Sequence, residues 1–139
     1  MAQDHGWRGD GRFRVARLDG QMVLRFGGIW TKRTRLKADM GAFFRKDYRA
    51  LRPRYGDFAV HIYVECERPR RRVDADNVAK ACLDALTGIL WRDDSQVQRL
   101  TVEKLAAPQD AVTLVVGEAG PSSASGELDA LIAAADKLG

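Results

Sequence analysis

The stretch RPRRRVDADNVAKACLDALTGILWRDDSQV, residues Arg68 to Val97, carries the densest pattern in this chain. Arginines crowd its start, two aspartates follow one residue apart, and a second pair of aspartates comes near its end. Between them, apolar residues recur at helical spacing, which predicts a helix from about residue 75 or 76 to 87. Gly88 suits the left-handed position just beyond a helix. The charges either neutralise each other on a surface or form a cation site beside a surface that binds an anion.

Asp74 and Asp76 fall at the start of this predicted helix. A helix N-terminus stabilises a carboxylate through capping and the macrodipole, which explains one of the two aspartates. It explains both less well, because two close carboxylates repel unless a cation lies between them. We expect the chain to bring Asp94 back beside Asp76 after the helix. Three carboxylates that leave open positions are the usual ligands of Mg²⁺.

Asp76, Lys80 and Asp84 recur at every fourth position and therefore share one face of the helix. One interpretation is a pair of surface ion pairs that contribute little to stability. The other is that Lys80 stands one turn from a metal-binding carboxylate, where its ammonium group neutralises a phosphate.

The remaining pattern predicts an α+β fold with a single mixed or antiparallel sheet packed by two helices, in the order β-β-α-β-α-β-β. Asp19-Gly20 between two alternating segments predicts a hairpin. The expected strands are residues 12–18, 21–26, 57–66, 97–105 and 111–117, and the first expected helix is residues 34–51. We expect one domain over residues 1–119, in which residues 1–11 form a mobile head. Residues 120–139 read as a Gly/Ser linker followed by a weakly helical or disordered tail.

The sequence has no apolar run of membrane-spanning length and no apolar signal segment at its start. Cys66 and Cys82 fall on the apolar phase of a predicted strand and helix. Buried, reduced thiols in a cytoplasmic protein are the expectation.

The net charge of +4 hides an asymmetry. Residues 30–72 contain thirteen Lys and Arg against five Asp and Glu, whereas residues 73–139 contain five against eleven. Either the two halves attract each other, or the basic half binds a polyanion while the acidic half binds a cation. The candidate residues for binding such a polyanion are Lys32, Arg33, Arg35, Lys37, Arg68, Arg70, Arg71 and Arg72.

The ordered set D-x-D-N-x-x-K, D-A-L and D-D-S-Q in this stretch resembles the RusA family of Holliday-junction resolvases. That resemblance implies a small, dimeric, Mg²⁺-dependent endonuclease, with Mn²⁺ as a substitute ion, acting on four-way DNA junctions in recombination and repair on a chromosome or a prophage. It assigns metal-linked roles to Asp74, Asp76 and Asp94 and the essential lysine to Lys80. Asp93 is the weaker candidate of its pair.

The N-terminal third departs from the family pattern, because a Gly-rich head and the Asp19-Gly20 hairpin replace a Pro-rich loop. Junction selectivity is therefore the property that the resemblance supports least. The main alternative is a non-catalytic nucleic-acid-binding module of the same fold. A small-molecule phosphohydrolase is a third possibility, which the excess of arginine disfavours.

Overall fold

The computed structural model describes residues 4–9, 12–28, 33–68 and 73–139. The described strands form one six-stranded sheet in the order β1-β2-β3-β6-β4-β5. The strands are β1 (His5–Arg8), β2 (Phe13–Leu18), β3 (Gln21–Gly27), β4 (Phe58–Cys66), β5 (Val97–Ala106) and β6 (Ala111–Glu118). The helices are α1 (Arg33–Asp47), α2 (Ala75–Leu86), the 3₁₀ turn η1 (Asp94–Gln96) and α3 (Ala124–Lys137).

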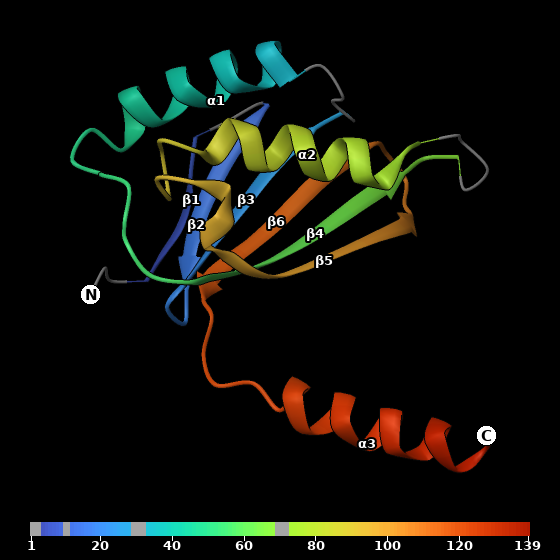
Figure 1. Cartoon of the computed structure of the whole chain (residues 1–139). Coiled ribbons are helices and arrows are strands. Elements are labelled where there is room, and N and C mark those ends of the chain that lie inside the picture. The colour runs from blue at the N-terminus through green and yellow to red at the C-terminus, as the bar shows by residue number, and fades with distance from the viewer. Residues whose placement is uncertain (1–3, 10–11, 29–32, 69–72) are drawn as a thin grey trace.

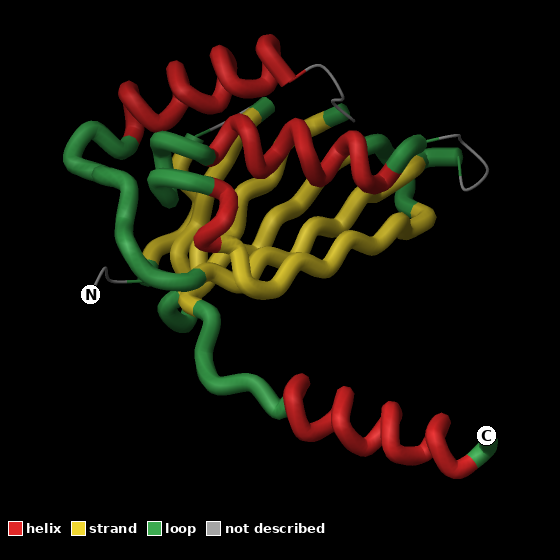
Figure 2. Tube along the Cα trace, viewed as in Figure 1, coloured by secondary structure: helices red, strands yellow, loops and turns green. Residues whose placement is uncertain are grey.

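The sheet is mixed, because β4 and β5 are parallel while the other neighbouring strands are antiparallel. Helix α2 is the crossover that joins the two parallel strands. Helices α1 and α2 lie together on one face of the sheet (Figures 1 and 2). The predicted α+β class, with one mixed sheet packed by two helices, is confirmed.

The hairpin between β2 and β3 is also confirmed. Asp19 and Gly20 have φ values of 53° and 76°, as a type I′ turn requires at both central positions. The expectation of a mobile head at residues 1–11 is wrong for His5–Arg8, which forms β1 and pairs antiparallel with β2. Four residues of sequence HGWR are too few to show a strand period, so pairing with β2 rather than local pattern defines this strand.

The core lies between the two helices and the covered face of the sheet. Strand β4 alternates as predicted, and every second side chain from Phe58 to Cys66 is buried. Trp91 is fully buried, its ring centroid 5.4 Å from that of Phe58, and its Nε1 donates a hydrogen bond of 3.1 Å to Thr87 Oγ1. Cys66 and Cys82 are buried free thiols, as expected.

Helix α1 ends at Asp47, four residues before the expected end at Leu51. The Leu51 N–H bonds to the Tyr48 carbonyl three residues earlier, so the chain tightens into a turn there. Helix α2 matches its prediction closely, and Gly88 follows it with φ of 89°.

Helix α3 follows the linker and is exposed along its whole length. Of the two expectations for the tail, the helix is the one observed, and it lies apart from the sheet (Figure 1). Within the described part of the chain, no helix is long and apolar enough to cross a membrane.

Candidate functional site

The N-terminus of α2 places Asp74, Asp76 and Lys80 next to one another. Asp74 is the residue that precedes the helix, and its carbonyl accepts the first helical hydrogen bond, from Val78 N–H at 3.1 Å. Its carboxylate makes no capping bond to the backbone and instead accepts one of 3.1 Å from Asn77 Nδ2. Helix capping therefore does not account for the side chain of Asp74.

The carboxyl groups of Asp74 and Asp76 interact with each other. Hydrogen bonding between the two groups is the main reason why the pKa of Asp74 is raised above its ordinary value and the pKa of Asp76 is lowered. The nearby charge of Lys80 also lowers the pKa of Asp76. Two carboxylates close enough to share a proton are close enough to bind one cation between them.

Lys80 lies one helical turn beyond Asp76, and its Nζ is 3.7 Å from Asp76 Oδ2. Both side chains are more than half exposed, at 58% for Lys80 and 69% for Asp76. A loose, exposed pair of this kind adds little stability. The ammonium group is therefore available to a second anion beside the carboxylates.

The second pair of aspartates has divided roles. Asp93 precedes η1 and caps it: its carboxylate accepts hydrogen bonds from Ser95 N–H at 3.2 Å and from Ser95 Oγ. These bonds lower the pKa of Asp93. Asp94 is exposed, and no hydrogen bond to its carboxylate is found among the described residues. Asp94 is thus the member of the pair that is available to a ligand.

Asp94 does not lie beside Asp74 and Asp76, so the expected convergence within one chain is wrong. Asp74 follows the carboxyl end of β4, whereas η1 leads into the start of β5, where Val97 pairs with Phe58 at the opposite end of β4. The intervening helix of 12 residues is about 18 Å long. In the described ranges, no group of three or more His, Cys, Asp or Glu side chains could hold a metal ion.

Gln96 holds the Asp94 turn, and the sequence analysis did not single it out. Its Oε1 accepts hydrogen bonds from the backbone N–H groups of Arg92 and Asp93 at 2.8 and 3.1 Å. Its Nε2 donates to the carbonyls of Arg54 and Gly56, both at 2.9 Å. The spacing of Asp93 and Gln96 is a capping-box signature, which is the sequence signal that could have identified it.

The structure describes part of the expected DNA-binding set. Lys32, Arg70, Arg71 and Arg72 lie outside the described residues, and Arg33 is the first residue of α1. Arg35, Lys37 and Arg68 are exposed. Lys37 Nζ donates a bond of 3.3 Å to the Asp84 carbonyl, which ties α1 to α2.

Comparison with known proteins matches residues 30–116 to the family model described as Endodeoxyribonuclease RusA. The relatives named Crossover junction endodeoxyribonuclease RusA in Escherichia coli (strain K12) and Shigella sonnei (strain Ss046), and the one in Enterobacteria phage 82, are similar over a shorter stretch. Each is 50% identical over 48 residues, which are 33% of this chain and 40% of the relative. The alignment thus spans about two fifths of the length of these relatives. Because the family model covers more than half of the sequence, this chain belongs to the RusA family.

Proposed function

We propose that this protein is a metal-dependent endodeoxyribonuclease that nicks branched DNA, with the four-way junction as its substrate. The observation that carries the proposal is the placement of Asp74 and Asp76 at an exposed helix start, with Lys80 one turn further along the same helix. The names of the relatives, crossover junction endodeoxyribonucleases, support the same substrate.

The pair fits a divalent cation such as Mg²⁺, with Mn²⁺ as a substitute, because both ions prefer oxygen ligands. When bound, such an ion supplies Lewis-acid chemistry to phosphodiester hydrolysis. Asp74 and Asp76 would hold it. Lys80, one turn further along α2, would face the phosphate and offset its negative charge.

Asp94 enters this proposal through a second copy of the chain. Because Asp94 leads into the start of β5, at the end of the sheet opposite to Asp74 and Asp76, the three aspartates of one chain do not come together. We infer a two-fold homodimer in which Asp94 of each copy completes the site begun by Asp74 and Asp76 of the other. A two-fold dimer carries two equivalent sites and matches the two-fold symmetry of a four-way junction, so it suits paired nicks.

The basic residues before Asp74 and in α1 would bind the DNA arms. Arg35, Lys37 and Arg68 are exposed, and Arg70, Arg71 and Arg72 come shortly before Asp74 in sequence. Phosphate contacts of this kind release counterions, so binding should weaken steeply as salt concentration rises.

The test compares the cutting of a labelled four-way junction and a linear duplex in Mg²⁺ and in EDTA. Wild-type protein should nick the junction in Mg²⁺ only, whereas Asp76→Asn should bind it and leave it uncut. Asp19→Asn is the matched control, because it makes the same chemical change in the hairpin turn, where asparagine tolerates the observed φ of 53°.

Wild-type protein that retards the junction but never cuts it in Mg²⁺ would support the non-catalytic binding module instead. Cutting by Asp76→Asn at the wild-type rate would contradict the assignment of the site.

A further inference from the structure

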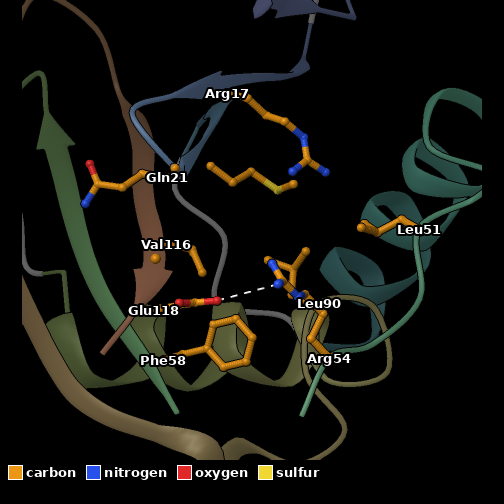
Figure 3. Close-up of a pocket in the computed structure, with 11 residues that line it drawn as sticks. Arg17, Gln21, Leu51, Arg54, Phe58, Leu90, Val116 and Glu118 are labelled. Atoms are coloured by element: carbon orange, nitrogen blue, oxygen red, sulfur yellow. Dashed lines mark hydrogen bonds and ion pairs between the residues drawn. The ribbon is translucent and has the colours of Figure 1, made fainter. Parts of the chain in front are cut away.

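A hollow of about 340 Å³ opens where the β2–β3 hairpin, the segment after α1, Leu90 and the end of β6 meet (Figure 3). Its volume falls at the lower end of the range of small-molecule sites. No catalytic role proposed above uses the residues that line it. Its floor is apolar, and its rim carries the charged side chains of Arg17, Arg54 and Glu118.

The floor is made of Met22, Phe58, Leu90 and Val116, each between 4% and 7% exposed. Leu51 adds a half-buried side chain at one wall. These apolar side chains belong to the core and also face the hollow, so an apolar group placed there would extend the core outward. A flat ring is one such group.

The rim places two guanidinium groups around this floor. Figure 3 shows the side chains of Arg17 and Arg54 directed toward the same space from different elements. Arg54 Nη2 is 3.5 Å from Glu118 Oε1, and both side chains are strongly exposed, at 65% and 79%. Such a pair is weak. No carboxylate of the described residues forms an ion pair with Arg17. The rim therefore favours an anion, and planar guanidinium groups match phosphate oxygens.

Hydrogen bonds connect the hollow to the turn that carries Asp94. Gln96, two residues after Asp94, donates a bond of 2.9 Å to the Arg54 carbonyl. The Arg54 N–H in turn donates a bond of 3.0 Å to the Leu90 carbonyl. A group held in the hollow therefore sits against the same backbone that positions Asp94.

We propose that this hollow binds a nucleotide: the base lies on the apolar floor, Arg17 and Arg54 bind its phosphate, and the Glu118 carboxylate accepts a hydrogen bond from an exocyclic amine. Within the proposed function, which this inference extends, the nucleotide is one unstacked from the junction strand beside the Asp94 turn. Enzymes that unstack a base place it in a pocket of this type, with stacking and hydrogen bonds. A free mononucleotide has the same chemistry, and the test separates the two sources.

Methionine methyl groups give a direct readout of occupancy in the full-length protein. Met22 lines the hollow, whereas Met40, on the buried face of α1, is 1% exposed and serves as the internal reference. Protein labelled with ¹³C at the methionine methyl groups is titrated with dAMP and, separately, with a four-way junction in EDTA. Met22→Leu assigns the signal.

We expect both titrations to shift the Met22 methyl signal and to leave that of Met40 in place. Arg54→Gln should weaken dAMP binding about tenfold, the worth of one charge-assisted hydrogen bond. Arg52→Gln is the matched control, because Arg52 does not line the hollow and its guanidinium bonds to the backbone carbonyls of Arg49 and Leu51. It should change the affinity by less than about twofold.

Three results would overturn the proposal. A Met22 signal that moves with neither titrant means that no nucleotide binds. A signal that moves with dAMP and not with the junction assigns the hollow to a free nucleotide rather than to DNA. A signal that changes with protein concentration alone means that a second copy of the chain fills the hollow. Loss of cutting with an intact Met22 shift would count against the proposed nuclease function and leave the pocket standing.

Discussion

Replacing Gln96 by alanine tests how the Asp94 turn is held. The side chain makes four hydrogen bonds: two accepted from the N–H groups of Arg92 and Asp93, and two donated to the carbonyls of Arg54 and Gly56. Each such bond contributes about 0.5–1.5 kcal/mol net to stability. Water can replace part of these bonds, because Gln96 is only half-buried. We therefore expect Gln96→Ala to lower the free energy of unfolding by about 2–3 kcal/mol.

Urea denaturation followed by circular dichroism measures this loss, and a drop of that size lowers the midpoint by about 1–2 M. Gln98→Ala is the matched control, because Gln98 is exposed on β5 and donates a single bond of 3.3 Å to Asp57. Gln96→Glu should be at least as destabilising as Gln96→Ala, since a carboxylate loses both donors and turns an oxygen toward the Arg54 and Gly56 carbonyls. A Gln96→Ala protein no less stable than Gln98→Ala would refute this reasoning.

Asp74, Cys82 and Trp91 each give one further prediction. The pKa of Asp74 is raised in the folded protein, so ionisation of its carboxylate lowers the stability as pH rises through that pKa. Thermal melts in EDTA should therefore show Asp74→Asn more stable than wild type at pH 7 and not at pH 3. If the two proteins melt alike at pH 7, the bond to Asp76 is absent. Burial raises the pKa of Cys82 to about 12, so the native protein should react with a thiol reagent at pH 8 no faster than it unfolds; rapid labelling would contradict its burial. Trp91→Phe removes the hydrogen bond to Thr87 and part of a fully buried ring, so it should lower the free energy of unfolding by about 2–3 kcal/mol. Chemical denaturation measures this change, and a decrease below about 1 kcal/mol would not fit this packing.

The local sequence pattern correctly predicted the elements that show strand alternation, helical spacing or a turn-forming residue pair. The alternation of β4, the Asp19-Gly20 hairpin and the apolar phase of α2 are all local properties of the sequence, and the structure has each of them. Strand β1 was missed because its four residues are too few to show an alternating pattern, and it is a strand because it pairs with β2.

The positions of the site residues depend on topology, which periodicity does not encode. Asp74 and Asp76 are neighbours on one helix end, so sequence spacing was enough to bring them together. Placing Asp94 required knowing that β4 and β5 are parallel, because a helical crossover between parallel strands returns the chain to the opposite end of the sheet. The hollow of Figure 3 combines side chains from β2, β3, β4, β6 and the segments after α1 and α2, and no local pattern connects them.

The central claim is that each active site combines Asp74 and Asp76 of one copy with Asp94 of another, and mixing two inactive variants tests it directly. Asp76→Asn and Asp94→Asn proteins are each assayed alone and then as an equimolar, re-equilibrated mixture on a labelled four-way junction in Mg²⁺. In a mixed dimer, one shared site carries both substitutions and the other is fully wild type. The account therefore predicts that the mixture recovers about a quarter of wild-type nicking, since half of the dimers are mixed and each has one intact site of two. A mixture that contains mixed dimers, shown by pull-down of two different tags, and still does not nick the junction would contradict the shared site.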